Sequence, residues 1–115
     1  MRKVILAALF AGVAFSAEAA EWKYLGFANG HYLSAMSPEW TSKTNLRVWI
    51  TLGDKAGYSL ILEEINCKSR FIRSLGGQQY NLQDNVVAPE FESAWVPAVP
   101  HSMGMALVTY ACESY

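Results

Sequence analysis

The sequence predicts a mainly β protein: a single small domain built on an antiparallel sheet of about six strands, with one short helical turn and one disulfide bond. Apolar and polar residues alternate in short segments separated by turn residues, and no segment keeps a helical period, which predicts the sheet. Two cysteines in a chain of 115 residues predict the bond. No repeat, low-complexity tract or long linker divides the chain, so one domain is expected.

Residues 1–19 have the three parts of a secretory signal peptide: a basic start, an apolar run over residues 4–15, and small residues before an expected cleavage point after Ala19. The apolar run is shorter than the roughly 20 residues that cross a bilayer. We therefore expect cleavage, export, and a domain formed by residues 20–115 with no integral membrane segment. No cysteine lies near the cleavage point, so no lipid anchor is expected. The periplasm, the cell surface and the medium all stay open as destinations.

The charge balance gives no sign of a polyanionic partner. The full chain has nine basic and ten acidic residues. Removal of residues 1–19 takes away Arg2, Lys3 and Glu18, which leaves a net charge of about −2 without a run of either sign. This balance predicts neither nucleic acid nor an anionic membrane surface as a partner.

Cys67 and Cys112 are the two cysteines of the chain. Because an exported protein meets an oxidising environment and a small core gains from a cross-link, we expect them to be bonded to each other. A metal site is the alternative, but two cysteines and two histidines at these spacings match no usual zinc pattern. We therefore predict no metal and no cofactor.

The first predicted elements form a hairpin. Residues 22–28 alternate as a strand, the pair Asn29-Gly30 suits a two-residue turn, and residues 31–34 form the returning strand. Ser37 followed by Pro38 then resembles a helix start, so a short helical turn through Trp40 is expected.

Residues 46–52 form the clearest strand. Leu46, Val48 and Ile50 share one face and belong in the core, which leaves Arg47 and Trp49 on the other. After a turn over residues 53–57, a long strand is expected over residues 58–67.

The inward face of the 58–67 strand stays open, because its alternation is imperfect. If Cys67 is bonded beneath the sheet, Ile61 and Ile65 lie inward with it. Glu63 then lies near an edge or meets a basic residue.

The last third of the chain predicts two further strands and a loop. Residues 68–75 form a strand that ends at Gly76-Gly77. Residues 80–92 lack a sustained period and are expected to be a loop with at most a short strand at residues 86–87. Residues 105–112 alternate, so they are expected to be a terminal strand with Cys112 near its end.

The sequence resembles the bacterial surface-adhesin protein E family. The resemblance rests on the order of spaced features over nearly the whole predicted domain, none of them specific alone. They are Trp22, Tyr32, Val48-Trp49, Cys67, Arg73, Tyr80, Trp95, Pro100-His101-Ser102 and Cys112. The sequence differs at Ser34, where family members often carry an acidic residue.

The resemblance implies a curved antiparallel sheet with minor helix and a structural disulfide. It also implies export to the surface of a Gram-negative bacterium, where the named family member acts as an adhesin for host epithelial, matrix or plasma proteins and can form a homodimer. A periplasmic interaction module or inhibitor that binds envelope proteins is the alternative function.

We predict no catalytic residue. His101 and Ser102 are adjacent and so point apart on an extended chain, and no nucleophile-elbow pattern surrounds the serine. Glu63 and Glu64 are adjacent on one strand and cannot form a carboxylate pair. His31 is expected in a turn or at the surface. A small secreted hydrolase is therefore the last of three functional hypotheses.

Arg47, Trp49 and Arg73 are the candidate protein-binding residues. A tryptophan beside an arginine on the polar face of a strand has the composition of a binding hot spot. The alternative is that residues 80–92 cover Trp49, which would make it a packing residue.

Overall fold

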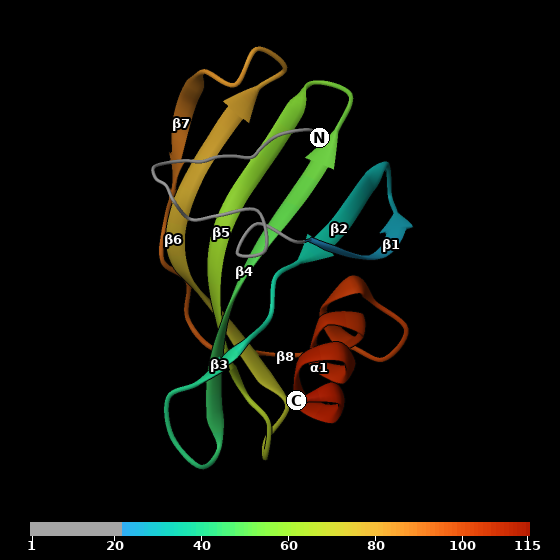
Figure 1. Cartoon of the computed structure of the whole chain (residues 1–115), viewed down its shortest axis with the longest axis vertical. Helices are drawn as coiled ribbons and strands as arrows, with labels where there is room; N and C mark the ends of the chain where they lie inside the picture. The colour runs from blue at the N-terminus through green and yellow to red at the C-terminus, as the bar shows by residue number, and fades with distance from the viewer. Residues whose placement is uncertain (1–21) are drawn as a thin grey trace.

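The computed structural model describes residues 22–115, and the predicted signal peptide lies outside the described residues. The elements are β1 (Lys23–Ala28), β2 (His31–Ala35), β3 (Glu39–Trp40), β4 (Asn45–Asp54), β5 (Gly57–Asn66), β6 (Phe71–Asn81), β7 (Val86–Glu90), β8 (Val96–Pro97) and α1 (Met103–Ser114). Within this part of the chain, all eight strands join one antiparallel sheet (Figure 1). The predicted mainly β class and antiparallel sheet are confirmed.

The main path of the sheet runs β1-β2-β4-β5-β6-β7, while the two-residue strands β3 and β8 pair with β4 and β6. The central hairpin is unbroken, because β4 and β5 pair from Asn45 opposite Asn66 to Asp54 opposite Gly57. The predicted first hairpin also forms. Asn29 and Gly30 both have positive φ values, 55° and 80°, as a turn that follows the twist of the strands requires.

The core lies between one face of the sheet and α1. The predicted aliphatic face of β4 is buried there, with Leu46 fully buried. Ile61 and Ile65 of β5 are buried on the same face, as expected if Cys67 is bonded. Glu63 shares that face on a central strand, so its predicted place near an edge or a basic residue is wrong.

The predicted terminal strand is wrong, because Met103–Ser114 is the helix α1. Ser102 has extended backbone angles, φ −106° and ψ 169°, and its hydroxyl accepts a hydrogen bond from the Met105 amide, so it is an N-cap. The buried residues of the helix, Leu107, Val108 and Ala111, are spaced to pack one helical face into the core. A short apolar run allows both periods, and here tertiary packing selects the helix.

Two further predictions are corrected. The expected helical turn before Trp40 is the short strand β3, in which Glu39 lies opposite Arg47 of β4. The Trp40 indole donates to the Tyr115 carbonyl at 3.2 Å, so contact with the chain after α1 helps to hold this segment extended.

The expected strand end at Gly76-Gly77 and the loop after it are also wrong, since β6 continues to Asn81 and β7 follows. A glycine is needed at position 77 for this pairing, because the Cβ of any other residue would lie 2.0 Å from the Leu60 carbonyl oxygen of β5. The two glycines therefore allow close strand pairing instead of ending the strand.

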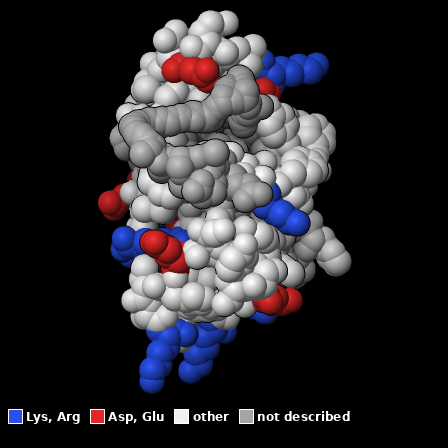
Figure 2. Space-filling model, viewed as in Figure 1, with Lys and Arg blue, Asp and Glu red and all other residues white. Residues whose placement is uncertain are grey.

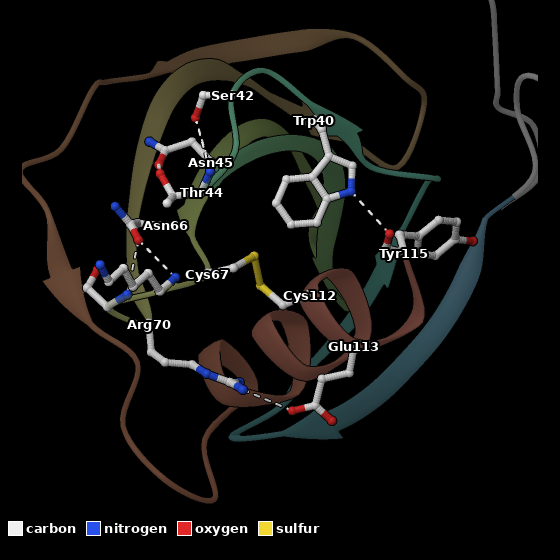
Figure 3. Close-up of a disulfide and its surroundings, with 12 residues drawn as sticks. Trp40, Ser42, Thr44, Asn45, Asn66, Cys67, Arg70, Cys112, Glu113 and Tyr115 are labelled. Carbon is white, nitrogen blue, oxygen red and sulfur yellow. Dashed lines mark hydrogen bonds and ion pairs between the residues drawn. A yellow bond between two sulfur atoms is a disulfide. The ribbon is translucent and has the colours of Figure 1, made fainter.

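The predicted disulfide is confirmed: Cys67 and Cys112 are bonded, with their Cα atoms 5.7 Å apart (Figure 3). Cys67 follows β5 and Cys112 lies in the last turn of α1, so the bond fastens the helix to the sheet. Arg70 and Glu113 add an exposed ion pair at 3.0 Å beside it.

Candidate protein-binding face

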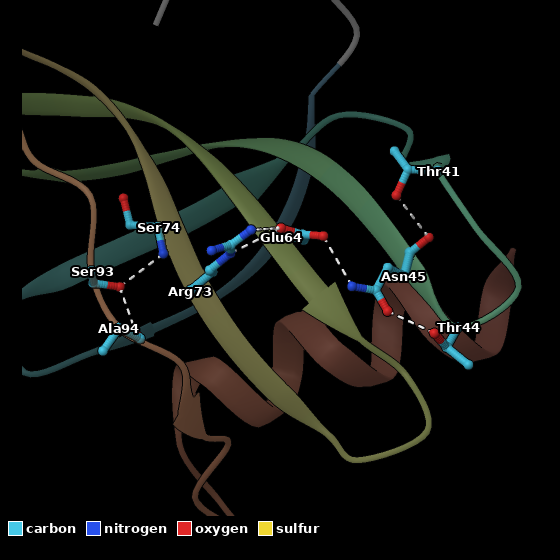
Figure 4. Close-up of polar contacts among 8 residues, drawn as sticks. All are labelled: Thr41, Thr44, Asn45, Glu64, Arg73, Ser74, Ser93 and Ala94. Atoms are coloured by element: carbon cyan, nitrogen blue, oxygen red, sulfur yellow. Dashed lines mark hydrogen bonds and ion pairs between the residues drawn. The ribbon is translucent and has the colours of Figure 1, made fainter.

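The sheet has a second face, turned away from α1, which we call the outer face. Strand register assigns its side chains, because directly opposed residues share a face. Figure 4 looks onto it, with α1 behind the sheet. The outer-face residues used below are Tyr24, Phe27, Tyr32, Ser34, Glu39, Arg47, Trp49, Thr51, Tyr58, Leu60, Leu62, Glu64, Arg73, Gln78 and Tyr80.

Trp49 lies on the outer face of β4, opposite Leu62 of β5, and its side chain is 42% exposed. Arg47 lies two residues earlier on the same face and is exposed too. Residues 80–92 form the end of β6, a turn and β7, at the far side of the sheet from β4. They do not bury Trp49, so Arg47 and Trp49 form an accessible pair.

Arg73, the third candidate, is held by its neighbours. Its Nε and Nη2 donate to Oε1 of Glu64 at 2.9 and 2.7 Å, and its guanidinium lies 4.8 Å from the centre of the Trp95 ring. Asn45 Nδ2 donates to the other oxygen of Glu64 at 2.9 Å (Figure 4). These contacts fix Arg73 on β6, two strands away from Arg47.

Glu64 is 7% exposed, so its charge needs these partners. The hydrogen bond from Asn45, then those from Arg73 and the charges of Arg73 and Arg47, hold the pKa of Glu64 below its ordinary value. Register places Glu39, Arg47, Glu64 and Arg73 opposite one another in a single row across four strands. Charge therefore alternates along this border of the outer face.

Beyond Trp49 the strands place aromatic and uncharged side chains on the outer face, a feature that the sequence analysis missed, and the Asp84 carboxylate from the turn before β7 accepts a hydrogen bond from the Tyr58 hydroxyl at 2.8 Å. Register joins Phe27, Tyr32, Gly53, Tyr58 and Tyr80 in one cross-strand row. A row of this kind is spread over five strands, so it becomes visible only when the register between strands is known. The Tyr58 and Tyr80 rings stack at 5.0 Å, and Phe27 is 63% exposed.

The α1 side carries a polar cluster that the sequence analysis also missed. Glu90 of β7 reaches over Gly77, and its Oε2 accepts hydrogen bonds from Ser59 and Gln79, each at 2.8 Å. Glu63 lies near it, and burial, with a smaller effect of the Glu90 charge, raises the pKa of Glu63 to about 7. The cluster therefore pairs a carboxyl whose pKa lies near neutral pH with a carboxylate that is hydrogen-bonded to Ser59 and Gln79.

The remaining polar candidates have structural positions. The Ser102 hydroxyl caps α1 and donates to the Val99 carbonyl oxygen, while His101 has a positive φ of 64° in the turn before it. His31 lies 3.3 Å from a carboxylate oxygen of Asp54, at the adjoining hairpin ends. His31 belongs to the β1–β2 hairpin, whereas His101 and Ser102 belong to the turn before α1.

Figure 2 shows basic side chains gathered at the lower end of the view and charges of both signs elsewhere on the visible surface. The turns at that end, before β4 and after β5, contain Lys43 and Lys68. Among residues 22–115, no group of three or more His, Cys, Asp or Glu side chains is placed to hold a metal ion. No helix of this part of the chain is long and apolar enough to cross a membrane.

Fold and site together define a small antiparallel β domain with one disulfide, one helix-covered sheet face and one aromatic face. Comparison with known proteins found no relative: no family model, curated protein or solved structure matches the chain.

Proposed function

We propose that this protein is an exported, non-enzymatic protein-binding domain of the surface-adhesin protein E type, which attaches to host matrix or plasma proteins. The observation that carries the proposal is the exposed Trp49 beside Arg47, on a sheet face opposite the one described helix. An indole that stays accessible at the surface gains free energy when a partner covers it. Covering the outer face with a protein partner would therefore be energetically favourable.

The composition of the face supports a protein partner. Interfaces concentrate Trp, Tyr and Arg at their centre and keep other charges at the rim, as the aromatic rows and the alternating charged row do here. Within residues 22–115, no hydrogen bond or ion pair engages the Arg47 guanidinium, which leaves its donors for a partner's carboxylate or carbonyl groups. Arg73 contributes at the rim by neutralising Glu64.

Binding is tested with the exported protein on surfaces coated separately with matrix proteins and with plasma proteins. Trp49→Ala should weaken binding about tenfold or more, as expected for a hot spot. Phe91→Ala is the control, because Phe91 is 76% exposed in the segment after β7. Equal binding by Trp49→Ala, Arg47→Ala and the parent protein would exclude the outer face as the contact.

The location of the exported protein distinguishes adhesion from the alternative function, a periplasmic module that binds envelope proteins. A disulfide is compatible with both, since both compartments are oxidising. Protease treatment of intact cells should digest the protein if it acts as an adhesin. Full protection, with recovery in the periplasmic fraction, would assign the alternative.

A further inference from the structure

We infer that the outer face holds a second site, for a neutral glycan, on a platform formed by Tyr24, Tyr32, Ser34, Trp49 and Thr51. This site goes beyond the proposed protein-binding function, because it uses residues outside the Arg47 row and a ligand without charge. Its residues come from β1, β2 and β4, three neighbouring strands of the sheet.

Register places two hydroxyl side chains at the centre of the platform. Tyr24, Ser34 and Thr51 lie opposite one another on β1, β2 and β4. Trp49 precedes Thr51 by two residues, which is about 7 Å along the strand, and Tyr32 precedes Ser34 by the same spacing. Aromatic residues therefore lie on three sides of the two hydroxyls.

Tyr32 lies across the neighbouring strand. A Cβ on Gly53, directly opposite on β4, would be 2.9 Å from Cε1, 3.0 Å from Cζ and 3.1 Å from the hydroxyl of Tyr32. The ring thus takes the place of the missing Gly53 side chain, while Tyr32 stays 37% exposed. A ring that leans on the sheet in this way offers an apolar face to solvent, and the C–H face of a pyranose ring stacks on such a surface.

Thr51 supplies an independent observation. Its residue is 3% exposed, and its Oγ1 has no hydrogen-bond partner although it is buried. Burying a hydroxyl without a hydrogen-bond partner lowers the stability of the folded state, so its presence at this position calls for an explanation. A ligand hydroxyl supplies the missing bond once an exposed neighbouring ring turns aside. Tyr24 and Trp49, at 61% and 42% exposed, are free enough to do so.

The charge of the face selects the class of ligand. From Trp49 to the Tyr32 row, register places no charged residue on the outer face of β1, β2, β4, β5 or β6. A nucleic acid or a sulfated glycan would find no cation there to offset its charge. Stacking surfaces, free hydroxyls and neutrality together fit an uncharged sugar chain.

The experiment is an array of neutral, sialylated and sulfated glycans probed with the exported protein, followed by affinity measurement on the neutral glycan bound best. Thr51→Val is the decisive variant, because it keeps the shape of the side chain and removes only the unpartnered hydroxyl. It should weaken glycan binding about tenfold without lowering the melting temperature. Tyr24→Ala should weaken it as well, and Phe91→Ala and Arg47→Ala should leave it unchanged.

These outcomes distinguish the glycan site from the protein-binding function. If Arg47→Ala weakens binding to coated proteins while Thr51→Val weakens binding to the glycan, both sites stand. Three results would overturn the glycan site: no neutral glycan bound, charged glycans bound alone, or equal glycan affinity for Thr51→Val, Tyr24→Ala and the parent protein. If platform variants weaken protein binding and no glycan binds, the platform belongs to the protein interface.

Discussion

One carboxylate oxygen of Glu64 receives two hydrogen bonds from Arg73, at 2.9 and 2.7 Å, in a site where Glu64 is 7% exposed. Removing the guanidinium leaves a buried charge with Asn45 as its remaining bonded partner. Arg73→Ala should therefore lower the free energy of unfolding by about 1–3 kcal/mol. The loss stays below that of a fully buried pair because the Arg73 side chain is 37% exposed and solvent screens it.

Arg70→Ala is the matched control for Arg73→Ala, since it breaks the exposed pair with Glu113 and should cost about 1 kcal/mol or less. Urea unfolding at pH 7 measures both. The folded-state pKa of Glu64 is lowered, so its contribution is present above the unfolded carboxyl pKa and is lost as pH falls through the folded value. Equal losses for the two variants would contradict the special role of the Glu64 pair.

Cys67→Ser should cost about 2–5 kcal/mol in unfolding free energy, as loss of a disulfide does in small exported domains. The bond joins residues 45 apart in sequence, so its loss frees a long loop in the unfolded chain. The double variant Cys67→Ser/Cys112→Ser should be as unstable as the single one. Full thiol labelling of the denatured, unreduced parent protein would show that the bond does not form.

Glu63→Gln should remove a pH dependence of stability. Burial raises the folded-state pKa of Glu63 to about 7 from 4.5, so the protonated form is favoured in the fold. Its contribution is fully present below the unfolded value and is lost as pH rises through the folded value. Between pH 4.5 and pH 8 the free energy of unfolding of the parent protein should fall by on the order of 1–3 kcal/mol, whereas that of Glu63→Gln should not show this fall.

Denaturant unfolding across that pH range tests the Glu63 prediction, with Glu113→Gln as an exposed control. Parallel pH curves for the parent protein and Glu63→Gln would show that Glu63 titrates as an ordinary surface carboxyl.

Ser102→Ala tests the helix that replaced the predicted strand. The hydroxyl accepts the Met105 amide hydrogen bond at 3.2 Å, so its removal should cost about 1 kcal/mol. Ser102→Asp keeps an acceptor at the cap and should retain most of the stability. If both variants match the parent protein in thermal unfolding, the cap does not stabilise α1.

Alternation identified the strands whose two faces differ in burial. β4 is the clearest case, because Leu46, Val48 and Ile50 are buried while Arg47 and Trp49, which alternate with them, face outward. Alternation failed for α1, since the residues from Met105 to Cys112 are apolar enough to suit either period and the choice depends on what the core accepts. The capping serine was the available local signal for the helix.

The candidate pair Arg47 and Trp49 followed from one strand, so sequence was enough to place both on one face. The partners of Arg73 come from β5 and from the segment before β8. Its ion pair with Glu64 could therefore not be predicted from the spacing of residues in the sequence. The platform around Thr51 can be recognised only when the register of three strands is known. Properties local to one element were predictable, whereas those created by pairing between distant elements were not.

The bond between Cys67 and Cys112 also changes what a single cut does to the molecule. It closes a covalent ring that contains β6, β7, β8 and nearly all of α1. The exposed segment 91–94 lies inside that ring, where a protease would find accessible backbone. One cleavage there opens the ring but releases no fragment, so the nicked protein stays in one covalent piece until the disulfide is reduced.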